Sequence, residues 1–373
     1  MSAERRARHV PAGLYWKARL FESTAGLWRM LARLETAVLG DELAGVAVRE
    51  PIYVAGVARS GTTLVTEMLA RHPDVTSHRY SDFPNVHTPF WRNWLAERTR
   101  RPAPAAVERA HKDRLMVTPE SPEAVEEVVW MQFFDHLHDP ASSHVMDSDV
   151  DAPAFARHYR EHVAKLLLAR GASRYLAKGN YNTTRLGYLL QLFPDARIVV
   201  PVRQPVQHVA SLVKQDRLFT RLAEEDPRVP GQLARSGHFE FGPGKRAINA
   251  SDADLAAEIH ARWSAGEAAA GWALYWDSVY RHVLDFIDAH PERAGQVLLL
   301  RYEDLCADPA AAIDAVLDHC RLSAGGFDDV RAEYVERISP PDYYRPDFSE
   351  ADVGTIEATC GETVRRLGYA VST

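Results

Sequence analysis

Cysteine is scarce in this sequence, with 3 among 373 residues, and all of it lies late in the chain. Cys306, Cys320 and Cys360 form no closely spaced pair. The sequence therefore predicts neither a disulfide-stabilised scaffold nor a cysteine-rich metal site. We expect these thiols to be buried in the core, as unpaired cysteines usually are.

Long apolar runs are also missing. The longest, such as 198–202 and 297–300, are far shorter than the roughly 20 residues that a membrane-spanning helix needs. Residues 1–10 are rich in arginine but contain neither the apolar stretch nor the cleavage site of a secretory signal. We expect no membrane span and a cytoplasmic protein.

Positive charge is in deficit, because 44 Lys and Arg residues stand against 51 Asp and Glu, for a formal net charge of −7. General nucleic-acid binding needs an exposed excess of cations along the phosphates. We therefore expect no nucleic-acid partner, and any anionic ligand must meet a local group of cations. With 46% hydrophobic and 25% charged residues, the composition is that of a globular protein with a sizeable core.

Short apolar runs alternate with segments of helical periodicity along the middle of the chain. This alternation predicts strands followed by helices in a three-layer α/β fold with a central parallel sheet and right-handed crossovers. The predicted strand–helix pairs are 52–56 with 62–71, 175–178 with a helix from about 182, 197–203 with 206–214, and 296–300 with 309–319.

We expect one catalytic domain over 51–325, with long insertions at 80–170 and 217–250. The first reads as irregular chain and helices, and the second has no clear periodicity. Loops of that size are usually lids or binding segments. Helices over 1–50 would cover the sheet or mediate association as a homodimer, and 326–373 would form a C-terminal extension.

A glycine-bounded loop joins the first strand to its helix. Gly56 and Gly61 bracket four residues, a spacing that lets backbone N–H groups surround a phosphate at the start of a helix. In an NTP-hydrolysing enzyme a lysine would stand where this chain has Thr62. The neighbouring strands end in Lys178 and Arg203, not in the acidic residue that would hold magnesium. The pattern indicates a ligand with several anionic groups and no required metal.

The loop Gly56-Val-Ala-Arg59-Ser60-Gly61-Thr62-Thr63 resembles the 5′-phosphosulfate loop of the sulfotransferase superfamily. Arg203 and Ser211, eight residues apart, resemble the 3′-phosphate signature of that family. Lys178 stands where tyrosylprotein and carbohydrate sulfotransferases carry a catalytic lysine, and the run 301–305 followed by 308–309 is also similar to the family.

The resemblance implies a P-loop-containing nucleotide hydrolase-like fold and 3′-phosphoadenosine 5′-phosphosulfate (PAPS) as the cosubstrate, without a metal. Lys178 and Arg59 would be catalytic by stabilising the charge that develops on the leaving group. The implied cosubstrate-binding residues are Arg59, Ser60, Gly61, Thr62, Thr63, Arg203 and Ser211.

The resemblance does not supply a general base, because Arg79 or Tyr80 stands where related enzymes carry Glu. Asp82 is the nearest carboxylate and our first choice as a third catalytic residue. The alternatives are His78, His87, Glu126 and Glu127. We expect the two glutamates to be solvated or salt-bridged.

Two further groups have both a functional and a structural interpretation. The basic glycine-rich segment 242–246 would close over the nucleotide or form an exposed loop. The aromatic residues would line an acceptor site or pack the insertion. These are Phe83, Phe90, Trp91, Trp94 and Trp130.

The sequence favours an enzyme that moves a sulfuryl group from PAPS to a hydroxyl of a carbohydrate or another small metabolite by in-line displacement. A P-loop kinase-like phosphotransferase and a non-catalytic nucleotide-binding protein are the alternatives.

Overall fold

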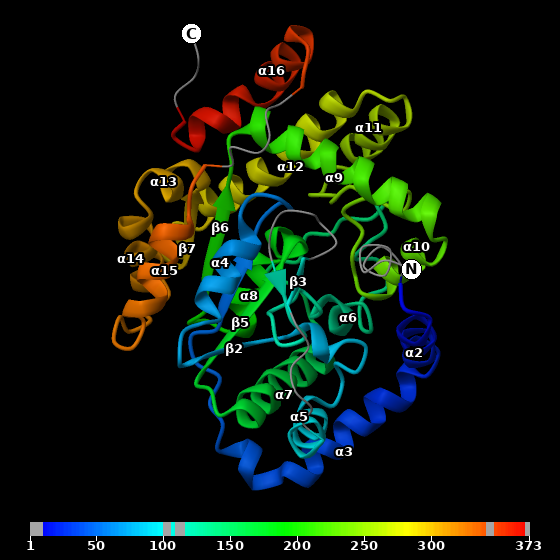
Figure 1. The fold of residues 1–373 in the computed structure, drawn as a ribbon, viewed down its shortest axis with the longest axis vertical. Helices are drawn as coiled ribbons and strands as arrows, with labels where there is room; N and C mark the ends of the chain where they lie inside the picture. The colour runs from blue at the N-terminus through cyan, green and yellow to red at the C-terminus, as the bar shows by residue number, and fades with distance from the viewer. Residues whose placement is uncertain (1–9, 100–105, 109–115, 341–346, 370–373) are drawn as a thin grey trace.

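The computed structural model describes residues 10–99, 106–108, 116–340 and 347–369. The arginine-rich start of the chain, apart from Val10, lies outside the described residues, as do parts of the predicted 80–170 insertion and of the C-terminal extension. Figure 1 shows helices arranged around a central sheet.

The sheet has five parallel strands in the order β2-β5-β1-β6-β7. These are β1 (Ile52–Ala55), β2 (Val75–Ser77), β5 (Arg174–Gly179), β6 (Arg197–Val202) and β7 (Val297–Arg301). Every residue of the central strand β1 is buried, as the apolar sequence of a two-sided parallel strand requires. The predicted parallel α/β sheet is confirmed. Strand β2 was not predicted, because three residues carry no readable period.

Two helical layers cover the sheet, and alternate residues of β1 face them. Tyr53 and Ala55 belong to the core on one side, with side chains of α7 (Pro153–Arg170), α8 (Leu186–Leu192), α9 (Pro205–Glu225) and α12 (Ala268–Ala289). Ile52 and Val54 face the other side, with α4 (Thr62–Leu69), α14 (Pro309–His319) and α15 (Asp328–Arg337). This arrangement is the predicted three-layer order.

The N-terminal segment is helical, as predicted, with α2 (Ala12–Ser23) and α3 (Ala25–Ala44). Lys165 of α7 donates from Nζ to the carbonyl of Ala32 over 2.6 Å and pairs with Glu35, which fixes α3 against α7. Several large apolar side chains of α2 and α3 stay exposed, so association of two copies through these helices stays a prediction. They are Trp16, Leu20, Leu27, Met30, Leu34 and Val38.

The first predicted insertion contains helices, as expected, and the second contains more helix than predicted. The first holds η1 (Tyr80–Asp82), α5 (Pro89–Arg98), β3 (Val107–Glu108), β4 (Met116–Val117), α6 (Glu127–Trp130) and α7. The second was expected to be irregular from residue 217, but α9 continues to Glu225 and α10 (Arg228–Arg235) follows. The prediction was wrong there because the apolar face of α9 packs in the core beyond residue 214, where Phe219 is buried.

The remaining elements complete the two layers. They are η2 (Asn180–Thr184), α11 (Ala253–Ser264), η3 (Ala294–Gln296), α13 (Tyr302–Ala307) and α16 (Glu350–Arg366). The C-terminal helix α16 packs on α12, and its Ile356 and Cys360 belong to the main core. Cys320 is also buried and Cys306 is half-buried, without disulfides. Within the described ranges every helix is too short or too polar to cross a membrane.

Candidate functional site

The glycine loop turns tightly between β1 and α4. A side chain at Gly56 would place Cβ 3.0 Å from the carbonyl oxygen of Pro201. Gly61 has a φ of 107°, and a Cβ there would lie 2.9 Å from the ring of Tyr302. Gly61 therefore requires glycine for space and for backbone conformation, and at Gly56 a side chain would be crowded and its neighbours would have to shift. The loop ends at the N-terminus of α4, where helix amides and the helix dipole favour an anion.

His208 of α9 is bonded to the backbone of this loop at Ala58. Trp276 donates from Nε1 to Nδ1 of His208 over 3.1 Å, so the proton of the imidazole is on Nε2, which lies 2.8 Å from the carbonyl oxygen of Ala58. Burial lowers the pKa of His208 to about 3, so the ring stays neutral near pH 7. Sequence reasoning missed this residue, because its partners in the chain lie 150 and 68 positions away.

Lys178 lies at the end of β5 beside the loop, in the position that the sequence predicted. Its Nζ donates to Oγ1 of Thr63 over 3.3 Å and lies 3.7 Å from Oε1 of Glu123. The pKa of Glu123 is lowered to about 2, because the charge of Lys178 and further partners outweigh burial, which alone would raise it. Glu123 is thus an ionised carboxylate that holds the ammonium group of Lys178 beside Thr63 of the loop.

Arg203 and Ser211 also come to the loop. Arg203 follows β6, and its guanidinium carbon lies 5.2 Å from the ring centroid of Tyr302, the ring that also limits space at Gly61. Arg59 donates from Nε to Oγ of Ser211 over 3.4 Å. The glycine loop and the predicted 3′-phosphate signature are therefore in direct contact, although Arg59 and Ser211 are 152 positions apart in the chain.

The run 301–305 connects these parts. Tyr302 lies between the loop and Arg203, as described above, and Glu303 accepts from the backbone N–H of Gln204 over 3.0 Å. Tyr369, near the end of the described chain, donates its hydroxyl to the same carboxylate over 2.7 Å. Residues around Arg203 are thus fixed by α13 and by the segment after α16.

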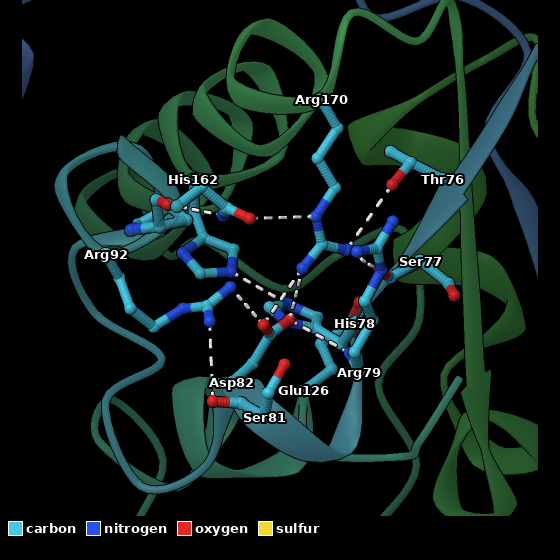
Figure 2. Close-up of polar contacts among 12 residues, drawn as sticks. Thr76, Ser77, His78, Arg79, Ser81, Asp82, Arg92, Glu126, His162 and Arg170 are labelled. Atoms are coloured by element: carbon cyan, nitrogen blue, oxygen red, sulfur yellow. Dashed lines mark hydrogen bonds and ion pairs between the residues drawn. The ribbon is translucent and has the colours of Figure 1, made fainter. Parts of the chain in front are cut away.

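Asp82 lies in a different environment from the one that the sequence suggested. It is 1% exposed, and both oxygens lie 2.9 Å from Nη2 of Arg170. Its Oδ2 also accepts from the backbone of Arg79 and lies 3.1 Å from Nδ1 of His78, while Arg92 pairs with the other oxygen. Figure 2 shows Arg170 and Arg92 both reaching this carboxylate.

This geometry argues against Asp82 as the general base. Burial would raise the pKa of Asp82, but the hydrogen bond from His78 and the charges of Arg170 and Arg92 outweigh it and hold the pKa well below its usual range. A carboxylate that is buried and bonded on both oxygens has no site for the proton of a bound alcohol. Its role here is to join the segment that follows β2 to α5 and α7.

The other sequence-based candidates for the base are buried and bonded too. His78 is 3% exposed, with Nδ1 at Asp82 and Nε2 3.0 Å from Nε2 of His162. His87 is equally buried beside Gln132, and burial together with the charges of His158 and Arg29 lowers its pKa to about 3.

Glu126 and Glu127 are buried, and the expectation that both are solvated or salt-bridged is wrong for Glu126. Glu126 accepts from Nε1 of Trp130 over 2.9 Å and from the hydroxyl of Tyr175. Glu127 is salt-bridged, as the alternative expectation had it, with Arg185 and His138 each 2.7 Å away. Among the described residues no cluster of three or more His, Cys, Asp or Glu side chains is arranged to hold a metal ion.

The aromatic residues predicted as one group are dispersed. Trp130 is fully buried and packs on Phe155 at 4.4 Å between ring centroids. Trp94 is 47% exposed under Arg98, and Phe90 packs beside α3. Phe83 and Trp91 line a separate cavity. The packing interpretation holds for Trp130.

The basic segment 242–246 is held against the protein. Lys245 pairs with Asp216 of α9 over 3.0 Å, and the N–H of Gly242 donates to the same carboxylate over 2.9 Å. Arg246 donates to the carbonyl of His138 over 2.8 Å. These bonds argue against a loose basic lid over the nucleotide.

Comparison with known proteins agrees with this arrangement. Residues 51–231 match the sequence model of the sulfotransferase family. Sulfotransferase STF9 from Mycobacterium avium has a similar fold, with a TM-score of 0.52, 14% identity, and coverage of 90% of this chain and 82% of that one. Sulfotransferase STF1 from Mycobacterium tuberculosis gives a TM-score of 0.44 and 16% identity over 91% of this chain and 83% of that one. No curated protein sequence matched the chain. The matched residues 51–231 contain the glycine loop and the Arg203 and Ser211 pair, so this part of the chain has the sequence pattern of the sulfotransferase family.

Proposed function

We propose that this chain transfers a sulfuryl group from PAPS to a hydroxyl of a small-molecule acceptor, of which a carbohydrate is the example expected from the sequence. One observation carries the proposal: three cations from different segments gather at the glycine loop. Arg59 belongs to the loop, Lys178 donates to Thr63 of the loop, and Arg203 lies over the ring of Tyr302, which adjoins Gly61. Three cations around one loop suit a donor with several anionic groups.

The residues fit this donor in two parts. The loop between Gly56 and Thr63 has no side chain at its two crowded glycine positions, which would let backbone N–H groups approach a phosphate and its sulfuryl group. Arg203 and Ser211 would hold the 3′-phosphate, for which the planar guanidinium suits paired contacts. The hydrogen bond between Arg59 and Ser211 brings the two parts close enough for one nucleotide.

The chemistry that these residues support is an in-line displacement. The acceptor oxygen attacks sulfur as the bond from sulfur to the phosphate oxygen breaks, and the negative charge develops on the departing bisphosphate. Lys178 and Arg59 would stabilise this charge, and Glu123 would keep the ammonium in place without a metal.

A kinase-like phosphotransferase is less well supported. Its magnesium ion would need an acidic strand end beside the loop, whereas β5 and β6 lead to Lys178 and Arg203. Calorimetric titration with 3′-phosphoadenosine 5′-phosphate (PAP), ADP and ATP, with and without magnesium, tests the proposal. Tight, metal-independent binding that needs the 3′-phosphate is expected, and a preference for ATP with magnesium would refute it.

A further inference from the structure

A histidine that no sequence motif indicated lies near Lys178. His238 lies between α10 and α11, and it lines the same pocket as Lys178, Asn180 and Glu240. The segment is fixed to the end of β5, because the N–H of Phe239 donates to the hydroxyl of Tyr181 over 2.9 Å. Asn180 donates from Nδ2 to Oε1 of Glu240 over 2.8 Å, which adds a second link to the same strand end.

His238 has the arrangement of an oriented base. Its Nδ1 lies 3.4 Å from Oε2 of Glu240, while its side chain remains 28% exposed. An Nδ1–H directed at a carboxylate leaves the lone pair on Nε2, the nitrogen that takes a proton in other His–carboxylate pairs. No hydrogen bond between described residues engages Nε2 of His238. This accessibility distinguishes it from Asp82, His78 and His87, which are buried and bonded.

An apolar cavity adjoins the same histidine. It has a volume of about 80 Å³ and is formed between α9, α10 and the segment that follows α10. His238 is thus shared between this cavity and the pocket of Lys178. The cavity is lined by Phe219, Val229, Leu233, Phe239 and Phe241, beside His238. It is smaller than an engineered cavity of about 150 Å³ that holds benzene, so it fits a group of a few carbon atoms.

We propose that the acceptor is an alcohol whose short apolar chain or ring edge occupies this cavity, with its hydroxyl at Nε2 of His238, and that His238 removes the proton of that hydroxyl. The inference rests on the proposed function and narrows its acceptor. A carbohydrate would place hydroxyl groups against phenylalanine rings, where they would lose water without gaining partners.

The step balances within the site. The O–H bond breaks and its proton passes to Nε2, while the oxygen lone pair forms the new bond to sulfur. The bond from sulfur to the phosphate oxygen breaks, and its electron pair leaves with PAP beside Lys178. Glu240 is a positioning residue, which orients the imidazole and stabilises its positive charge.

The cavity is tested with labelled PAPS and a series of primary alcohols from ethanol to hexanol. KM should fall roughly fourfold for each added methylene until the cavity is filled, and N-acetylglucosamine should be a poor acceptor. Ala234→Phe, which fills the cavity, should abolish this dependence on length and leave PAP binding unchanged. Ala257→Phe, on an exposed face of α11, is the matched control. Three results would overturn the proposed acceptor class. They are a KM that does not change with the length of the alcohol, a preference for the sugar, and no turnover of any alcohol by an enzyme that binds PAP.

The base is tested with His238→Gln and the exposed control His136→Gln, using the best acceptor from that screen. His238→Gln should lower kcat at least 100-fold at an unchanged Kd for PAP, and His136→Gln should change neither. Undiminished turnover in His238→Gln would overturn the role of the histidine.

A pH profile tests whether Glu240 orients the imidazole of His238 or only stabilises the fold. Burial and the charge of Lys178 lower the pKa of His238. Glu240 and Glu123 raise it, and their effect is larger, so the pKa is raised overall. Because the base must be neutral, Glu240→Gln should move the acidic limb of kcat/KM to lower pH, and an unmoved limb would contradict the pairing. If the wild-type protein does not bind PAP, the proposed function is refuted. This result differs from those that would overturn the acceptor class or the role of His238, so failure of the proposed function and failure of this inference are distinguishable.

Discussion

Replacement of Asp82 by asparagine distinguishes a structural carboxylate from a catalytic one. The substitution keeps the shape of the side chain and removes its charge. Arg170, which is buried, would lose its anionic partner, and the amide group of asparagine would face donors instead of accepting from them. We expect Asp82→Asn to destabilise the fold and to leave the chemistry of the folded enzyme unchanged.

The magnitude follows from the burial of the network. Removing one partner of a buried ion pair costs about 3–5 kcal/mol. An unfolding entropy of about 2.1 cal/mol/K per residue gives roughly 0.8 kcal/mol/K for 373 residues, so Tm should fall by about 4–6 °C. The exposed pair between Arg366 and Asp288 is the control, because Asp288→Asn should cost less than about 1 kcal/mol.

The difference in stability should also depend on pH. Because the folded protein holds the pKa of Asp82 below its ordinary value, this carboxylate stabilises the fold fully above about pH 4. The contribution is lost as the pH falls through the folded pKa, so the Tm values of wild type and Asp82→Asn should converge in acid.

Thermal denaturation monitored by fluorescence and turnover at 20 °C measure the two effects separately. A fall in Tm with kcat within threefold of wild type is the expected outcome. If Tm is unchanged while turnover is lost and PAP still binds, Asp82 is the base, and our assignment of it to the structural network is wrong.

Three further changes address the donor site. Lys178→Met should lower kcat about 10²–10³-fold in steady-state assays with little change in the Kd of PAP, and equal loss of donor affinity would contradict its role at the leaving group. Arg203→Ala should weaken PAP binding about 10–100-fold in calorimetry without weakening that of adenosine 5′-phosphosulfate, which lacks the 3′-phosphate. Gly61→Ala should abolish PAP binding, because φ is 107° and Cβ would meet Tyr302 at 2.9 Å; wild-type affinity would show that the loop adapts.

Much of the fold could be predicted from the sequence, because its signals lie within contiguous residues. The run over 52–56 is apolar throughout, as suits a central parallel strand, and the glycines that bound the loop follow directly. The helices after 182 and 309 carry an apolar stripe that must face the sheet. The extent of α9 was missed, because its distal turns are fixed by packing and not by a local signal.

The contacts within the site join residues that are far apart in the chain, so the sequence does not show them. His238 is 60 positions from Lys178 in the chain, and nothing in its immediate sequence distinguishes it from a surface histidine. Asp82 was our first choice as a base because it is the carboxylate nearest to the position where related enzymes carry Glu, but Arg170, 88 positions away, occupies its oxygens. Burial of this kind is a property of packed elements, and a linear pattern does not contain it.

The sequence by itself determined which residues form the glycine loop that we propose binds an anion, since two glycines, a cation and two threonines act through local backbone geometry. It also determined the order of strands and helices that places the loop at a strand end. Only the tertiary structure decided which ionisable side chains remain accessible beside Lys178, because accessibility and pairing depend on contacts between segments far apart in the chain. That is why the loop proposed to bind the donor could be singled out from the sequence, while His238 and its apolar cavity required the folded chain.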